Sequence, residues 1–143
     1  MVTRTWMILA TALLLPACKV HKPAPAQDTP AKRGGVELAF HVMSQCPFGG
    51  MVENAVKPAL DQLGPAVDFR LHFIGEEPSP GRLTSMHGDK EVQGDLLQIC
   101  AMKLAPDRFM DLVLCMNKDM KAIPGNFDAC AVDSKVDGPK VKA

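Results

Sequence analysis

Two segments of the chain alternate apolar and polar residues as β-strands do. Residues 36–43 and 67–74 each place an apolar side chain at every second position. Between them, residues 47–63 carry apolar side chains three and four positions apart, which predicts a helix that Gly64-Pro65 ends. We expect Pro58 to kink this helix without abolishing it. The pattern predicts a βαβ unit with parallel strands and a right-handed crossover.

The rest of the chain reads as helical after a long loop. Residues 75–88 contain two prolines and several glycines, and we expect an irregular loop there, of the kind that is often functional. A helix is predicted over 89–104, with Val92, Leu96, Ile99, Cys100 and Leu104 as its apolar stripe, and a second helix from Pro106. Asn126 is expected to cap a short final helix over 127–132, and the polar tail from Asp133 is expected to fray.

The first residues read as a targeting segment. Residues 1–17 combine Arg4 with a short apolar run, as a signal peptide does, and the run ends in Leu-Pro-Ala before Cys18. This ending resembles a lipobox, which predicts acylation of Cys18. Residues 18–35 are rich in proline and basic side chains and are expected to form a tether. The alternative is an ordinary signal peptide whose cleavage site falls near a cysteine. Either interpretation predicts an exported protein, and lipidation adds a membrane anchor on the periplasmic side or the cell surface.

Residues 36–143 then form one small α/β domain. The whole chain holds 16 basic and 16 acidic residues, so its formal net charge is zero. No basic stripe with interleaved aromatic residues is present, which argues against a nucleic-acid partner. If Cys18 is lipidated, four cysteines remain, and an exported location permits disulfides among them.

Cys46 is the strongest candidate for chemistry. It lies where the first predicted strand meets the first predicted helix, with Pro47 in the first helical position. The unpaired N–H groups and dipole of a helix start favour a thiolate, which is the reactive form of cysteine. The alternative is a buried, inert cysteine. His87 ends the long loop and can reach toward Cys46 as a histidinium, or it can simply hydrogen-bond at the helix start.

These features resemble the thioredoxin superfamily, and within it the gamma-interferon-inducible lysosomal thiol reductase family. The active-site motif corresponds to Cys46, Pro47, Phe48 and Gly49. Further on, the family pattern C-Q-H-G-x2-E-C-x2-N-x4-C is similar to residues 85–100, with matches at His87, Gly88, Glu91 and Cys100. The pairs Cys115-Met116 and Cys130-Ala131 resemble later pairs of the family. The resemblance implies a thioredoxin-like fold and thiol–disulfide exchange.

The chain departs from this family at several positions. Gly49 stands where the family has its second active-site cysteine, so Cys46 lacks a resolving thiol three residues on. Ser85 and Val92 replace two further cysteines, and Asp95 replaces an asparagine. The resemblance also implies a second half with two strands, a helix and a cis-proline, and we expect that C-terminal half to be missing. A partner chain that completes the sheet is one way to protect its open edges.

The remaining cysteines are better explained as structural than as redox groups. Cys100, Cys115 and Cys130, together with Cys46, allow three full pairings, and Cys115 with Cys130 is the easier bridge. His41 and His72 fall on the polar sides of their strands and are expected to face solvent. No ligand spacing typical of a metal site is present, and no metal or other cofactor is predicted.

The sequence therefore predicts an α/β protein, a partial thioredoxin-like βαβ unit with a helical extension. Its predicted activity is thiol–disulfide exchange through the single nucleophile Cys46, on protein disulfides or small thiols. The alternative is a non-catalytic binding lipoprotein, or a degenerate one, that keeps the scaffold. Gly49 and the expected absence of the C-terminal half favour this alternative.

Overall fold

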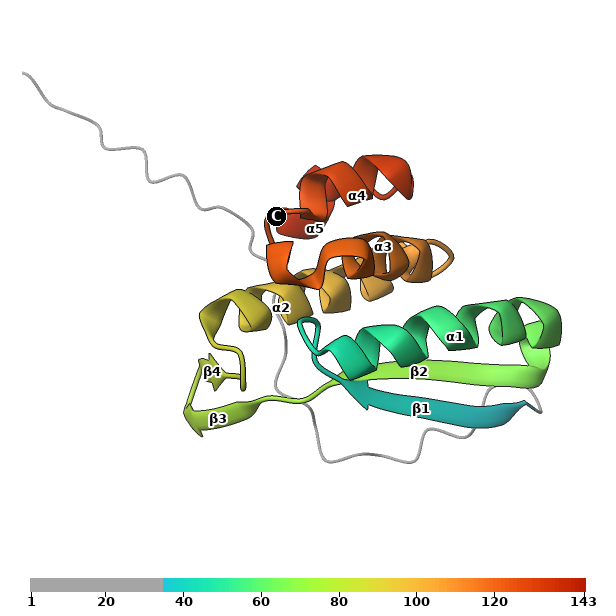
Figure 1. Ribbon diagram of the computed structural model, residues 1–143, viewed down its shortest axis with the longest axis horizontal. Helices are drawn as coiled ribbons and strands as arrows, with labels where there is room; N and C mark the ends of the chain where they lie inside the picture. The colour runs from blue at the N-terminus through green and yellow to red at the C-terminus, as the bar shows by residue number, and fades with distance from the viewer. Residues whose placement is uncertain (1–34) are drawn as a thin grey trace, which may run out of the picture.

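The computed structural model describes residues 35–143 (Figure 1). The predicted signal peptide, the predicted lipidation site Cys18 and the predicted tether up to residue 34 lie outside this range. Within the described part, no helix is both long and apolar enough to cross a bilayer.

The predicted βαβ unit is confirmed. Strand β1 (Val36–Val42) leads into helix α1 (Pro47–Leu63), which continues through Pro58. A single 3-10 turn, η1 (Gly64–Ala66), then leads into strand β2 (Val67–Phe73). The two strands are parallel and pair in register from Val36 with Val67 to Val42 with Phe73. This arrangement brings the end of β1 to the start of α1 (Figure 1), where Cys46 precedes the first helical residue.

The two faces of this sheet differ in polarity. On the inner face, Val42 and Leu71 are buried against Val113, and the rings of neighbouring phenylalanines meet edge to face. On the outer face, His41 and His72 are exposed, as predicted, and their rings stack with centroids 4.9 Å apart. Arg70 pairs there with the carboxylates of Glu37 and Asp68. The outer face is therefore polar.

The predicted irregular loop is wrong over part of its length. Residues 76–84 form an antiparallel hairpin of β3 (Glu76–Ser79) and β4 (Arg82–Thr84). Its turn is Pro80-Gly81, and Gly81 has a φ of 77°, a conformation that glycine adopts without steric cost. The Pro-Gly pair was the turn signal, but the strands beside it are short and exposed, so they lack an apolar alternation.

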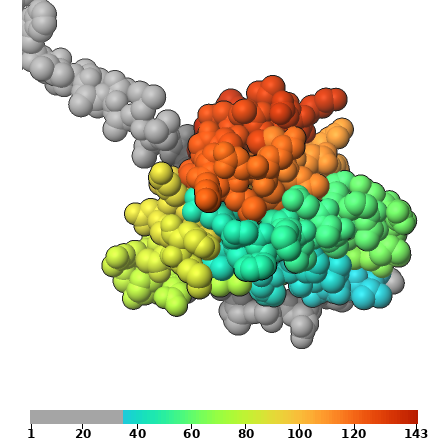
Figure 2. All heavy atoms as spheres, in the orientation of Figure 1, coloured from blue at the N-terminus to red at the C-terminus, as the bar shows by residue number. Residues whose placement is uncertain are grey.

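The helical extension begins as predicted with α2 (Asp89–Leu104). The next helix, α3 (Phe109–Met116), starts at Phe109 rather than Pro106, because residues 106–108 form turns. It continues as the 3-10 segment η2 (Asn117–Ala122), in which Asp119 leaves helical geometry. In the views of Figures 1 and 2 these C-terminal helices lie above α1 and the sheet.

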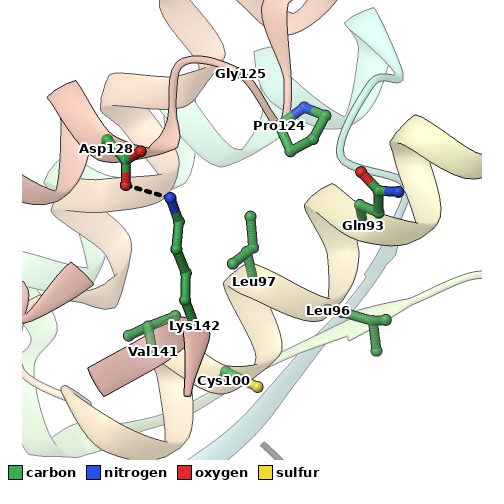
Figure 3. Close-up of a pocket in the computed structure, with 9 residues that line it drawn as sticks. All are labelled: Gln93, Leu96, Leu97, Cys100, Pro124, Gly125, Asp128, Val141 and Lys142. Carbon is green, nitrogen blue, oxygen red and sulfur yellow. Dashed lines mark ion pairs between the residues drawn. The ribbon is translucent and has the colours of Figure 1, made fainter. Parts of the chain in front are cut away.

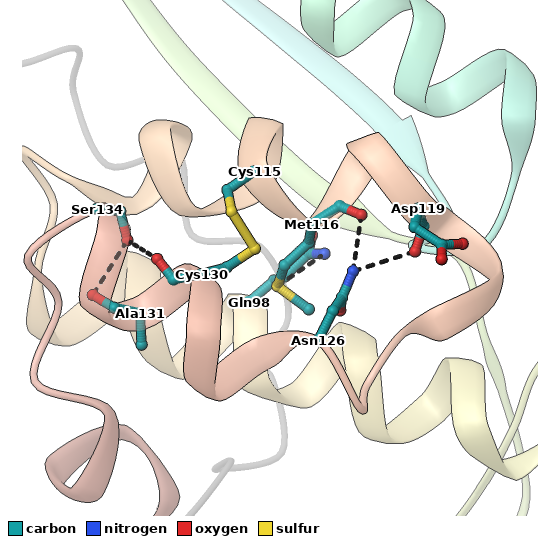
Figure 4. Close-up of a disulfide and its surroundings, with 8 residues drawn as sticks. All are labelled: Gln98, Cys115, Met116, Asp119, Asn126, Cys130, Ala131 and Ser134. Carbon is teal, nitrogen blue, oxygen red and sulfur yellow. Dashed lines mark hydrogen bonds between the residues drawn. A yellow bond between two sulfur atoms is a disulfide. The ribbon is translucent and has the colours of Figure 1, made fainter.

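Two predictions about the C-terminus need correction. Helix α4 (Phe127–Asp133) follows Asn126 as predicted, but the Asn126 side chain does not cap it. Its amide instead donates to the carbonyl oxygens of Met116 and Asp119, each at 3.0 Å (Figure 4). The tail does not fray: it forms α5 (Gly138–Lys142), and Val141 is buried. Isolated apolar residues such as Val136 and Val141 suffice to dock a short, capped helix.

The core of the helical extension is closed by a disulfide. Leu112, Met116, Ile123 and Phe127 are fully buried there, together with Cys100 and Cys130. The bond joins Cys115 of α3 to Cys130 of α4, which confirms the bridge predicted to be the easier one (Figure 4). The extension is thus a separately cored layer packed on the βαβ unit.

A hollow lies within this extension, between α2, α4 and α5 (Figure 3). Its volume is about 490 Å³, and its lining includes Leu96, Leu97 and Cys100. Lys142 and Asp128 form an ion pair at its rim. Cys46 is not among its lining residues, so this hollow is separate from the candidate nucleophile.

Candidate functional site

Cys46 occupies the N-cap of α1. Its backbone is extended, with φ −79° and ψ 117°, and Pro47 follows in the first turn. The Cys46 N–H donates to the Met43 carbonyl at 3.0 Å, and the Gly50 N–H donates to the Cys46 carbonyl at 3.0 Å. The side chain makes no capping hydrogen bond. Within the described residues Cys46 is the free cysteine, and it is half-buried.

Cys46 lines an open hollow of about 350 Å³. One wall is formed by residues 39–43, at the end of β1 and just after it, and the other is the start of α1, with Phe48, Gly49 and Val52. A second hollow of about 390 Å³ shares Met43 and Ile74 with the first and extends it toward the hairpin. The thiol is therefore accessible from a mostly apolar surface.

Helix α2 clamps the loop that carries Cys46. The Ser44 N–H donates to Asp95 Oδ1 at 2.9 Å, and the Gln45 N–H donates to Glu91 Oε1 at 3.1 Å. The Ser44 hydroxyl donates to the Glu91 carbonyl at 3.3 Å. Such close contact requires Gly94, since a Cβ at that position would overlap the side chains of Ser44 and Ile123.

Glu91 is the centre of this clamp. Besides Gln45, its carboxylate accepts hydrogen bonds from the Ser85 hydroxyl and from the His87 N–H, the latter at 3.1 Å. The His87 ring nitrogen Nδ1 lies 2.7 Å from Glu91 Oε1. Although burial alone would raise the pKa of Glu91, the hydrogen bonds from Ser85, His87 and Gln45 outweigh it and lower this pKa. His87 is thus held by the same carboxylate that holds the residue before Cys46.

A second polar cluster lies buried behind the clamp. Glu53 of α1 accepts from the Asn117 amide at 2.7 Å, while Glu53 Oε1, Asn117 Oδ1 and Gln98 Oε1 have no hydrogen-bond partner among residues 35–143. Burial raises the pKa of Glu53 to about 7, the Asn117 hydrogen bond opposes this, and the charge of Asp95 adds to it. Burial likewise raises the pKa of Asp95 to about 6, against the hydrogen bonds from Ser44.

Glu53→Gln is expected to remove a pH dependence of stability. The folded pKa of about 7 exceeds the ordinary value of 4.5, so the folded state binds the proton more tightly. The contribution of Glu53 is fully present below the unfolded pKa and is lost as pH rises through about 7. It amounts to at most ~3 kcal/mol between these limits. Urea unfolding at pH 4 to 8 measures it, and the variant should be the more stable protein at pH 8.

The matched control is Glu76→Gln, on the exposed strand β3, which should leave the slope of stability against pH unchanged. A Glu53→Gln variant that keeps the wild-type slope would mean that Glu53 stays charged in the folded protein. The amide can donate to one of the unpaired oxygens nearby, so the variant should not lose the cluster.

Sequence reasoning missed the clamp because it assigned α2 the wrong inner face. The predicted stripe of Val92, Leu96, Ile99 and Leu104 is half-buried or exposed, and of its members Cys100 alone is buried. The fully buried positions of α2 are mostly polar or small: Glu91, Gly94, Asp95, Gln98, Cys100 and Ala101. The signal was present, since Glu91, Asp95 and Gln98 recur at spacings of three and four. A pattern of apolar residues alone does not reveal this buried face of α2, because most of its residues are polar or small.

The structure brings some predicted site residues together and separates others. Pro47, Phe48 and Gly49 lie beside Cys46 on the first turn of α1. Cys100 lies in the core of the helical extension, as does the Cys115–Cys130 bond. At Gly49, a Cβ would lie 3.3 Å from Val42 Cβ, so a small side chain fits there with a slight adjustment. In residues 35–143 no three His, Cys, Asp or Glu side chains are grouped to hold a metal ion.

Comparison with protein families agrees with this geometry. The family model described as gamma interferon inducible lysosomal thiol reductase (GILT) matches residues 37–134. The match runs from β1 through the end of α4 and so includes Cys46, the Glu91 clamp and the disulfide. A search of curated proteins returned no match.

Proposed function

We propose, from the premise that the chain belongs to the gamma interferon inducible lysosomal thiol reductase family, that Cys46 carries out thiol–disulfide exchange as a single nucleophile. Membership of the family implies thiol reductase chemistry. The single-thiol mechanism is our addition. The observation that carries it is a free, half-buried cysteine at a helix N-cap, open to a hollow and without a capping bond.

The proposed reaction proceeds in three exchanges. The Cys46 thiolate attacks one sulfur of a substrate disulfide, forms a mixed disulfide and releases the other substrate sulfur as a thiolate, which takes up a proton. An external thiolate then attacks Cys46 Sγ and releases the second substrate thiol. A second external thiol frees Cys46 and leaves as the external disulfide. Two external thiols are thereby oxidised for each substrate disulfide reduced.

Cys46→Ser is expected to abolish this exchange. A serine hydroxyl is not ionised near neutral pH and cannot form a mixed disulfide. The full chain in mild detergent is mixed with N-acetylcysteine joined by a disulfide to thionitrobenzoate, whose release is coloured. The wild type should release the dye and gain the mass of N-acetylcysteine on Cys46. Equal release by the Cys46→Ser variant would show that Cys46 is not the nucleophile.

Gly49→Cys supplies the gain-of-function counterpart, with Gly49→Ser as its size-matched control. In the wild type the mixed disulfide should persist until an external thiol is added, because no second thiol follows on the first turn. A cysteine at position 49 should shorten its lifetime by attacking Cys46 Sγ, and serine should not. If the wild-type mixed disulfide decays as fast as that of the cysteine variant, another group resolves it.

The proposed substrates are protein disulfides or small thiols of an oxidising compartment. The Cys115–Cys130 bond supports such a location, since structural disulfides persist where the environment is oxidising. The sequence of residues 1–17 and Cys18 supports export and a lipid anchor on the periplasmic side or the cell surface. In this proposal the lipid anchor holds the domain near a membrane. The proposed exchange reaction requires no cofactor.

A second function, binding without catalysis, is favoured by Gly49. The family's second cysteine is replaced there, while the surface around Cys46 is mostly apolar. A protein of this kind would bind cysteine-containing polypeptides but would show no Cys46-dependent dye release in the experiment above. That experiment therefore separates the two functions.

A further inference from the structure

The edge of β1 that faces away from β2 is unpaired in the described part of the chain. The Val42 carbonyl accepts from the Ile74 N–H at 2.8 Å, so the backbone groups of Val42 point toward β2. Backbone groups alternate in direction along a strand, so those of Glu37, Ala39 and His41 point to the open edge. Within the described part of the chain, three residues thus direct their N–H and C=O groups to this open edge.

This open edge is one wall of the hollow that contains Cys46. Residues 39–43 line one side of this hollow. Cys46, which also lines it, lies between the end of β1 and the start of α1. A chain laid beside β1 as a strand would therefore pass directly by Cys46. The outer face of the sheet is polar and carries ion pairs, so it does not offer an apolar segment an alternative binding surface.

The rim of this groove is rich in exposed apolar side chains. Phe48 is 75% exposed and Val52 is 46% exposed on the α1 side. Ile74 and Met86 are 48% and 80% exposed where the groove continues toward the hairpin. Flexible and aromatic side chains of this kind contact varied apolar sequences without demanding one of them.

We propose that the open edge of β1 docks an extended, apolar, cysteine-bearing segment of a substrate polypeptide as an added strand, which delivers its disulfide to Cys46. This inference rests on the proposed function and names its substrate class. Backbone hydrogen bonds to Ala39 and His41 supply affinity, and apolar side chains of the segment contact Phe48, Val52 and Ile74. The occupant is an unfolded or locally extended protein, because a folded one buries such segments.

The chemical step is the first exchange described above. The Cys46 thiolate bonds to the sulfur of the docked cysteine, and the sulfur formerly bonded to that cysteine leaves as a thiolate. Cys46 is oxidised to the mixed disulfide as the departing sulfur is reduced to a thiolate, so the step needs no external oxidant or reductant. Its rate can therefore be measured without a resolving thiol.

The test compares two probes with the same leaving group on the full chain. One is an apolar, unstructured peptide of about ten residues, a usual strand length, with a central cysteine joined to thionitrobenzoate. The other is the N-acetylcysteine probe. The peptide should react faster and saturably. Ala39→Pro removes an edge N–H without removing a ladder bond, and should lower the ratio of the two rates about tenfold.

Two controls test whether strand pairing in the groove causes the faster reaction of the peptide. Val52→Ser in the groove should also lower the rate ratio, whereas Val132→Ser, an equally simple change on α4, should not. The same peptide N-methylated at alternate residues cannot pair as a strand and should lose its advantage, which tests docking without altering the protein. Equal rates for the parent and N-methylated peptides would overturn the proposal.

The dye release and the oligomeric state separate the ways in which the proposal can fail. If neither probe releases dye in a Cys46-dependent way, the proposed function fails, whereas a Cys46-dependent release with equal rates for both probes sinks the docking proposal alone. If the wild type sediments as a dimer that Ala39→Pro dissociates, the edge is occupied by a second copy of the chain, and the peptide proposal is overturned.

Discussion

Glu91→Ala is expected to lower the free energy of unfolding by about 3 kcal/mol, because the Gln45 N–H, the Ser85 hydroxyl and the His87 N–H each lose their acceptor. Glu91 is fully buried, so water does not replace it without opening the contact between α2 and the Cys46 loop. For a domain of this size the midpoint of thermal unfolding should fall by roughly 10–20 °C. Urea unfolding and thermal melts measure both quantities.

The pH dependence of this loss identifies its cause. The pKa of Glu91 is lowered from the ordinary value of 4.5, so its stabilising contribution is present above that value and is lost as pH falls through the folded pKa. The difference between wild type and Glu91→Ala should therefore shrink in acid. Lys90→Ala, on the same turn but exposed, should change little. A Glu91→Ala variant as stable as Lys90→Ala at pH 7 would show that the clamp contributes nothing.

Replacing Cys115 and Cys130 together by serine is expected to cost about 3 kcal/mol, since the bond closes a segment with a sequence separation of 15. The bond joins α3 to α4, and its loss leaves the docking of α4 on α3 to apolar contacts and to the hydrogen bonds of Asn126 (Figure 4). Denaturant unfolding of the oxidised wild type and of the double variant gives the difference directly.

Reductant provides the control for this prediction. Reduction breaks the Cys115–Cys130 bond, so the wild type treated with a strong thiol reductant should unfold at a lower denaturant concentration than the untreated wild type. If reduction leaves the wild-type midpoint unchanged, the bond does not contribute to stability in solution.

The sequence predicted the elements whose apolar residues alternate or recur clearly. Strands β1 and β2, helix α1 and the bounds of α2 follow from such patterns, and Cys46 follows from its place between two of them. The hairpin and α5 could not be predicted in this way, because each is short and exposes most of its side chains. Their stability comes from a Pro-Gly turn, a capping Asp137 and single buried residues.

The polar half of the site required tertiary information. Glu91 matches the family motif, but its position in the sequence shows only that it lies in the first turn of α2. Glu91 contacts several partners because Gly94 permits α2 to approach Ser44. It also requires that the loop before α1 and the loop before α2 both lie next to its carboxylate. Glu53 is similar: nothing in the pattern of α1 indicates that this carboxyl is buried against Asn117. Hydrogen-bond partners this distant in sequence leave no signal in the local pattern of residues.

The distances along the chain between the clamp and its partners also bear on the order of folding. Ser44 and Asp95 are 51 residues apart, and Gln45 donates to the Ile123 carbonyl across 78 residues. Contacts of such long range form late, since the intervening chain must first be ordered. During synthesis Cys46 emerges well before Ile123, so the nascent protein carries an unclamped thiol until the helical extension has docked.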